Sequence, residues 1–145
     1  MQVATGHKGK AAFKTTFYGE AGHSALAPKF TNALHLAADF MGELRGIQAE
    51  LAGNGPFDTA YEVPYTTLHV GKFSGGTTLN IVPALAEMHF EMRTLASQDI
   101  AALNVRIDAI VSKMNAARNC MKLERGHTYP GLNVDASQTL SLIHI

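Results

Sequence analysis

Residues 86–93 run Ala86-Glu87-Met88-His89-Phe90-Glu91-Met92-Arg93, with apolar and polar side chains alternating at every step. Successive side chains of a β-strand point to opposite faces of its sheet, so this stretch predicts a strand with one apolar and one polar face. Such a strand is typical of an antiparallel sheet that is covered on one side only. The covering layer must come from other parts of the chain.

The first half of the chain predicts two further strands and a helix. Lys10–Tyr18 alternates as a strand. After Thr31 and Asn32, either of which can serve as the N-cap, apolar residues recur at three- and four-residue steps. Residues 53–56, Gly-Asn-Gly-Pro, end this helix. Residues 66–70 then place three side chains on one face of a second strand.

The second half predicts another helix and a closing strand. We expect Ser97 to cap the helix, with Asp99 in its first turn. Cys120–Glu124 is a short apolar and polar run that predicts the closing strand. Thr128–Pro130 predicts an exit loop.

The predicted order is therefore β-α-β-β-α-β, in the α+β class. Two amphipathic helices and a sheet with one polar face predict a two-layer sandwich of ferredoxin-like type, in which an antiparallel sheet carries both helices on one face. We assign residues 1–130 to this domain. Residues 131–145 are interpreted as an exit segment and a tail introduced with the expressed sequence.

Composition excludes several classes of function. Lys and Arg together number 12, as do Asp and Glu, so the net charge is zero and no basic stripe suits a nucleic acid. No apolar run approaches the roughly 20 residues needed to cross a bilayer, and the first ten residues lack the apolar core of a signal peptide. The single cysteine, Cys120, excludes an internal disulfide and is expected to be a small buried residue. These features favour a cytoplasmic protein.

The seven histidines show no metal-binding spacing, since the chain has no H-E-x-x-H and no C-x-x-C motif. Glu87, His89 and Glu91 share one face of a strand, but three side chains in line converge poorly on one ion. A solvated sheet face is the better interpretation. We assign no metal ligand to this chain.

Two loops stand out by their residue types. Residues 22–28 place His23 between a glycine and a proline, and residues 78–83 place Asn80 before Pro83. Loops that hold a hydrogen-bonding residue on a rigid scaffold are common functional sites, although turns favour Gly, Pro, Asn and Ser in any case. From the residues alone, both interpretations stay open.

Several blocks of sequence follow one another in a family-specific order. They are Gly6-His7-Lys8-Gly9, Gly22-His23-Ser24-Ala25-Leu26-Ala27-Pro28 with Asn32-Ala33, Val63-Pro64-Tyr65-Thr66-Thr67-Leu68 with Val70-Gly71, Gly75-Gly76, Asn80-Ile81-Val82-Pro83 and Glu91-Met92-Arg93. With these blocks the chain resembles the M20 metallopeptidase family, and within it the acetylornithine deacetylases of arginine biosynthesis. The resemblance implies the lid and dimerisation domain of a zinc-dependent amidohydrolase. The catalytic domain, with its two zinc (or cobalt) ions, has no counterpart in this chain, so we expect the fragment alone to be inactive.

The resemblance also implies roles for three residues. His23 matches a catalytic histidine that donates a hydrogen bond to the oxyanion in the partner subunit's active site. Asn80 matches an asparagine that binds the N-acyl amino acid across the dimer, and Arg93 matches an arginine that holds the substrate carboxylate. Without the resemblance, Arg93 would be expected to pair with Glu91 or Glu87.

We further expect a homodimer in the full-length protein. Its predicted contacts are the first helix, near His35 and Asp39, and the edge strand near Leu68. The alternative is a free-standing ferredoxin-like module that binds a small molecule or a partner protein. A catalytic segment in the flanking gene would favour the amidohydrolase, and a complete gene ending near residue 145 would favour the module.

Overall fold

The computed structural model describes residues 6–133. Along the chain its elements are β1 (Gly6–His7), β2 (Gly9–Tyr18), the 3-10 helix η1 (Ser24–Lys29), α1 (Ala33–Asn54), β3 (Thr67–Gly75), β4 (Leu85–Thr94), α2 (Ile100–Met114), β5 (Met121–Tyr129) and β6 (Leu132–Asn133). Without the two-residue strands β1 and β6 and the short η1, this order is the predicted βαββαβ.

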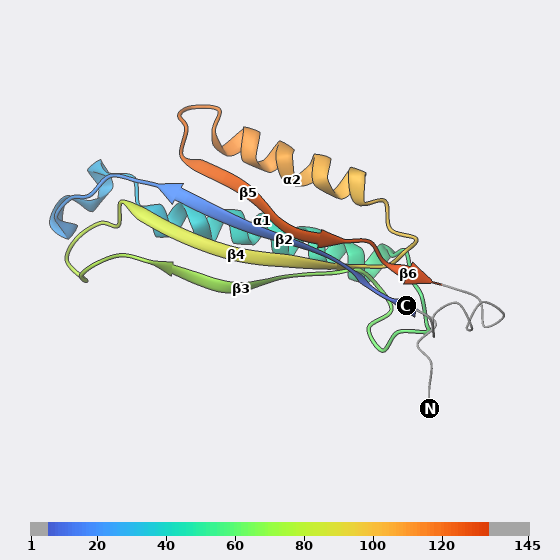
Figure 1. The fold of residues 1–145 in the computed structure, drawn as a ribbon. Coiled ribbons are helices and arrows are strands. Elements are labelled where there is room, and N and C mark those ends of the chain that lie inside the picture. Colours follow the sequence, from blue (N-terminus) through green and yellow to red (C-terminus); the bar gives the residue numbers. More distant parts are fainter. Residues whose placement is uncertain (1–5, 134–145) are drawn as a thin grey trace.

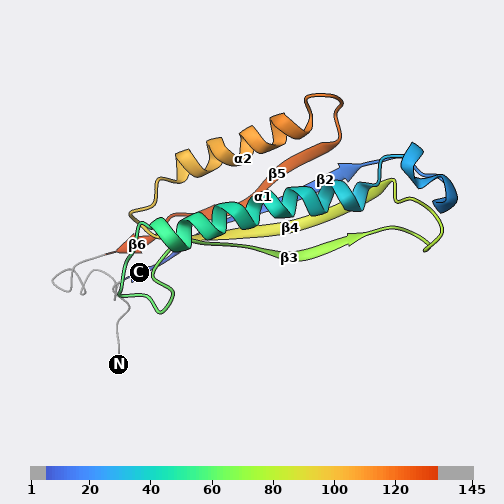
Figure 2. The same cartoon turned by 180° about the vertical axis from the view of Figure 1, so that it is seen from behind.

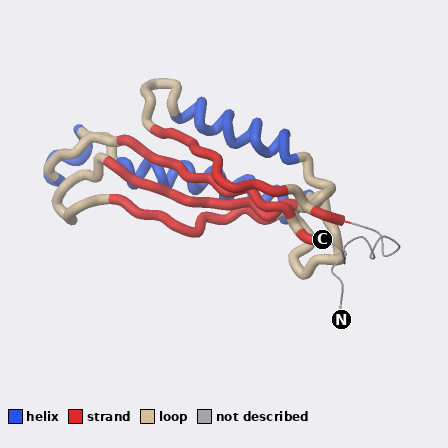
Figure 3. Tube along the Cα trace, viewed as in Figure 1, coloured by secondary structure: helices blue, strands red, loops and turns tan. Residues whose placement is uncertain are grey.

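The four long strands form one antiparallel sheet in the order β3-β4-β2-β5. Figures 1 and 2 show both helices on the same face of this sheet, and Figure 3 shows the strands as a single layer. α1 packs chiefly on β3 and β4, and α2 lies along β5. The predicted α+β class and ferredoxin-like arrangement are confirmed.

The core forms between the apolar face of the sheet and the helices. The predicted alternation in β4 is confirmed, because Met88 and Met92 are fully buried while Glu87 and His89 lie half-exposed on the other face. Phe13 of β2 stacks on its register partner Phe90 at a ring distance of 4.6 Å. Aromatic stacking of this kind adds to the stabilisation from buried area and fixes the register of the two central strands.

The N-cap of α1 agrees with the prediction from the sequence, and the N-cap of α2 differs from it. Asn32 caps α1, since its Oδ1 accepts hydrogen bonds from the backbone N–H groups of Leu34 and His35. Ser97 was the expected cap of α2, but the cap is Asp99, whose Oδ1 accepts from Ala102 N at 3.0 Å. A carboxylate at this position also interacts favourably with the helix dipole.

The closing strand is longer than expected. β5 runs from Met121 to Tyr129, so the predicted exit loop at residues 128–130 is wrong for its first two residues. The strand continues because its pairing with β2 resumes after a bulge and ends with Tyr129 opposite Lys10. Beyond it, β6 pairs with β1, which brings the incoming and outgoing chain side by side. The proposed tail lies outside the described residues from residue 134 onward.

The structure also bears on the predictions made from the single cysteine and from the lack of long apolar runs. Cys120 is buried, and its Sγ donates to the carbonyl oxygen of Met114 at 3.1 Å, which confirms the expected structural thiol. Within residues 6–133, no helix is both long enough and apolar enough to cross a membrane.

Candidate functional site

The histidine loop connects β2 to α1. His23 is the N-cap of η1, with its Nδ1 accepting a hydrogen bond from the backbone N–H of Ala25 at 3.1 Å. The preceding Gly22 lies against the ring of Phe30, and a Cβ there would lie 2.2 Å from the ring. Glycine is therefore required at this position for the loop to close over Phe30, which holds the imidazole at the exposed end of the fold.

The asparagine loop lies against the histidine loop. His23 and Ile81 form an isolated antiparallel bridge, with hydrogen bonds from Ser24 N to Asn80 O (2.9 Å) and from Val82 N to Gly22 O (2.7 Å). The structure thus brings His23 and Asn80 together, although 56 residues lie between them in sequence.

Both side chains present hydrogen-bond donors. Because His23 Nδ1 already accepts a backbone hydrogen bond, the hydrogen of the neutral ring lies on Nε2. In Asn80 the acceptor Oδ1 is used in the same way, since the hydroxyl of Thr78 donates to it at 2.8 Å. The atoms left for a ligand are His23 Nε2–H and the Asn80 amide NH₂, a pair suited to negative charge on oxygen.

Arg93 lies on the polar face of the sheet near the other end of β4. Its Nε donates to Glu91 Oε1 at 3.2 Å and its Nη1 donates to the hydroxyl of Tyr129 at 2.8 Å. Of the two ion pairs expected without a ligand, the structure shows the one with Glu91. Glu87 pairs instead with Lys14, at 3.3 Å.

Glu91 is the centre of a small charged network. Besides Arg93, it contacts Lys10 Nζ at 3.8 Å and His69 Nε2 at 3.4 Å. Partial burial by itself would raise the pKa of Glu91, but the hydrogen bond and charge of Arg93, with help from His69 and Lys10, hold the pKa below its ordinary value. The hydrogen bond to Glu91 likewise raises the pKa of Arg93. The pair is therefore ionised at neutral pH.

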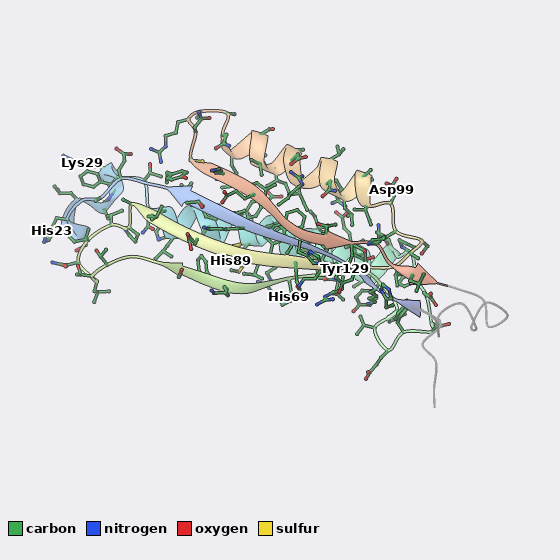
Figure 4. The ribbon with its side chains drawn as sticks, in the orientation of Figure 1. His23, Lys29, His69, His89, Asp99 and Tyr129 are labelled. Atoms are coloured by element: carbon green, nitrogen blue, oxygen red, sulfur yellow. The ribbon has the colours of Figure 1, made fainter. Side chains whose placement is uncertain are left out.

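The structure separates Arg93 from the two loops. Leu85 begins β4 at the loop end, and Arg93 is eight residues further on, a distance of ~27 Å at the rise of a β-strand. Figure 4 shows His23 at one end of the molecule and Tyr129, the partner of Arg93, towards the other. A single chain therefore cannot apply His23 and Arg93 to the same small molecule.

The described residues do not fit a metal ion. Within residues 6–133, no three side chains of His, Cys, Asp or Glu come close enough together to hold one. His89 and Glu87, on the strand face considered above, approach only to 4.0 Å and are both about 40% exposed. We derive no chemical step through a metal bound to this chain.

Comparison with known proteins gives the family. The profile described as "Peptidase dimerisation domain", of the M20 type, matches residues 5–119. The chain belongs to the M20 peptidase dimerisation domains. This dimerisation domain is similar to the acetylornithine deacetylase of Pasteurella multocida, with 32% identity over 108 residues, and to that of Shigella sonnei, with 31% identity over 104 residues. These matches cover 74% and 72% of the chain but only 28% and 27% of the two enzymes, so the dimerisation domain spans less than a third of their length.

Solved structures give the same fold at lower identity. An amidase of the hydantoinase/carbamoylase family from Burkholderia phymatum superposes with a TM-score of 0.77 at 19% identity, over 98% of this chain and 34% of that one. The aminopeptidase PepT of Bacillus cereus superposes with a TM-score of 0.68 at 20% identity, over 96% and 35%. In both cases the shared unit is about a third of a longer chain.

Sequence reasoning missed two side chains of this site. The exit loop predicted at residues 128–130 includes Tyr129, and the loop at residues 78–83 includes Thr78 without a predicted role for it. The one local signal for Thr78 is its spacing, because a hydroxyl two residues before an asparagine can reach the amide oxygen within a turn. Tyr129 carries no such signal, since its contact with Arg93 depends on the pairing of distant strands.

Proposed function

We propose that this chain is the lid and dimerisation domain of a metal-dependent amidohydrolase that deacetylates N-acetyl-ornithine or a related N-acyl amino acid. One observation carries the proposal: His23 and Asn80 present hydrogen-bond donors side by side on two loops that are joined by backbone hydrogen bonds. Arg93, which the same substrate would need for its carboxylate, lies far from this pair. The family membership and the similarity to acetylornithine deacetylases support the choice of substrate class.

The donors fit one step of amide hydrolysis. Attack of water on the carbonyl carbon puts negative charge on the carbonyl oxygen, and a hydrogen bond aimed at that oxygen lowers the barrier. His23 Nε2–H would supply this bond, and the Asn80 amide would hold the acyl or amide group beside it. The two zinc or cobalt ions expected in a separate catalytic domain would supply the activated water.

If His23 and Arg93 act on the same substrate, the ~27 Å along β4 between the loop end and Arg93 is too long for a single subunit. In our proposal His23 and Asn80 of one subunit complete the active site of its partner, where the partner's own copy of the arginine binds the substrate carboxylate. Next to the two donors, Leu79 is fully exposed and Leu26 is half-exposed. Large apolar side chains at the tip of a loop suit a surface that becomes buried against another subunit.

The surface that would join the subunits is the flank formed by α1 and β3. His35 and Asp39 are exposed on α1, and β3 is an edge strand of the sheet. The side chain of Leu68 lies in the core and its N–H is bonded to Gln48 of α1. We therefore assign edge pairing to the part of β3 after Leu68.

The ends of the described chain support a domain inserted into another. Gly6 pairs with Asn133 and His7 pairs with Leu132, so the incoming and outgoing strands form one short ribbon. A domain joined to a larger one by two connections needs its ends side by side.

We place the enzyme in the cytoplasm, where the unpaired Cys120 would stay reduced.

Substrate assays on the full-length enzyme test the proposal. We expect hydrolysis of N-acetyl-ornithine, dependent on added zinc or cobalt, and no hydrolysis by the purified 145-residue chain under the same conditions. Turnover by the chain alone would contradict a separate catalytic domain. An inactive full-length protein that binds a small molecule or partner would instead favour the free-standing module.

A further inference from the structure

The guanidinium of Arg93 is held on two sides. Arg93 Nε–H donates a hydrogen bond to Glu91 Oε1 at 3.2 Å, and Arg93 Nη1 donates one to the hydroxyl oxygen of Tyr129 at 2.8 Å. An arginine has five N–H donors in one plane, so three remain: two on Nη2 and one on Nη1. The two contacts thus fix the plane of the guanidinium and leave its terminal nitrogens for a carboxylate.

Both holding residues are themselves fixed. Glu91 contacts Lys10 and His69 as well as Arg93. Tyr129 is the last residue of β5, opposite Lys10 of β2, and its ring contacts the rings of His7 and His127 at centroid distances of 6.0 and 5.6 Å. A long side chain on an exposed sheet face would otherwise sample many rotamers, and these neighbours reduce that freedom.

We propose that Tyr129, together with Glu91, is a positioning residue that sets the orientation of Arg93 for the α-carboxylate of the substrate. Tyr129 acts through Arg93 and does not touch the substrate. The preference for substrates with a free carboxylate then depends on a phenol hydroxyl at the end of β5. This inference rests on the proposed function, in which Arg93 binds that carboxylate.

The test uses the full-length enzyme and two matched substrates, an N-acetyl amino acid and its carboxamide. We expect Tyr129→Phe to raise KM for the carboxylate about tenfold, as for the loss of one hydrogen bond to a charged group, with kcat unchanged. The carboxamide should show no change. In an Arg93→Ala background, Tyr129→Phe should have no further effect, because the residue through which it acts is gone.

Controls separate this role from a structural one. Tyr65→Phe removes a phenol hydroxyl that has no hydrogen-bond partner within residues 6–133, and it should leave both substrates unaffected. Glu91→Gln serves as a second variant if Tyr129→Phe folds poorly, and it should also raise KM for the carboxylate only.

The outcomes distinguish this inference from the proposed function. If Arg93→Ala leaves KM for the carboxylate unchanged, the assigned role of Arg93 fails and this inference fails with it. If Arg93→Ala raises KM but Tyr129→Phe and Glu91→Gln do not, only the positioning role is overturned. Equal losses on the carboxylate and the carboxamide would also overturn it, since they would indicate general damage to the fold.

Discussion

The backbone N–H of Ser24 donates a hydrogen bond of 2.9 Å to the carbonyl oxygen of Asn80. This bond, with the bridge between His23 and Ile81, joins two loops that follow different strands into one unit. A displacement of one loop must therefore carry the other with it. In the proposed function, this connection would hold the two donor side chains at a fixed spacing for a substrate.

His23→Ala in the full-length enzyme should reduce kcat by about two to three orders of magnitude, the usual effect of losing one oxyanion donor. The reason is that Nε2–H is the ring donor left for the substrate, because Nδ1 accepts a hydrogen bond from Ala25 N. Steady-state kinetics, metal analysis and sedimentation measure the effect, and only kcat should change. His89→Ala removes a half-exposed imidazole from the sheet face and is the matched control. Near-normal turnover of His23→Ala would reject the assigned role.

Asn80→Asp should lower kcat/KM at least about tenfold, because it replaces the NH₂ donor with a charged acceptor at nearly constant shape. The hydroxyl of Thr78 can still donate to the new carboxylate, so the loop should keep its structure. Asn119→Asp, at an exposed position before β5, controls for the added charge. Unchanged kinetics in Asn80→Asp would show that the amide does not contact the substrate.

Gly42→Arg should dissociate the dimer while stabilising the monomer. Gly42 lies one turn after Asp39 on the exposed side of α1, and nothing lies within 4 Å of a Cβ placed there. Arginine favours a helix over glycine by roughly 0.8 kcal/mol, so the melting temperature of the monomer should not fall. Ala109→Arg on α2 adds the same charge away from the proposed interface. Sedimentation that still shows a dimer for Gly42→Arg would place the interface elsewhere.

The network around Glu91 should make stability depend on pH. The pKa of Glu91 is lower in the folded protein than its ordinary value of 4.5. Its contribution is therefore fully present above that value and is lost as the pH falls through the folded-state pKa. Because the side chain is 26% exposed, we expect only about 1 kcal/mol at neutral pH. Thermal melts of Glu91→Gln should lie a few degrees below wild type at pH 7, and the difference should disappear at a pH below the folded-state pKa of Glu91. A constant difference across this range would contradict the assignment.

The sequence predicts the fold well in elements that have one face toward solvent and one toward the core, because apolar and polar residues then recur at a regular spacing. The alternation in β4 and the apolar stripe of α1 are each decided within a few residues, because every side chain must face either water or the core. The helix start at Asp99 is harder to predict, because Ser97 is an equally favourable cap residue by type and lies only two positions away. Tyr129 could not be found from the sequence, because its strand continues through a register shift that is set by β2.

The candidate site divides in the same way. Sequence blocks predicted His23, Asn80 and Arg93, and the structure adds that the first two are neighbours while the third lies at the far end of β4. That separation is a property of strand length and of the way the two loops meet. A list of motifs in sequence order does not contain it.

The most direct test mixes two impaired full-length variants, His23→Ala and Arg93→Ala, after dissociation and reassociation of the subunits, and assays them at a substrate concentration well below KM. In a mixed dimer one active site would receive an intact histidine from one subunit and an intact arginine from the other, and the second site would lack both. Random reassociation should then restore about a quarter of the wild-type activity, because half the dimers are mixed and each has one complete site. Mixed dimers that form but show no recovered activity would contradict the claim that the histidine and the arginine at one active site come from different subunits.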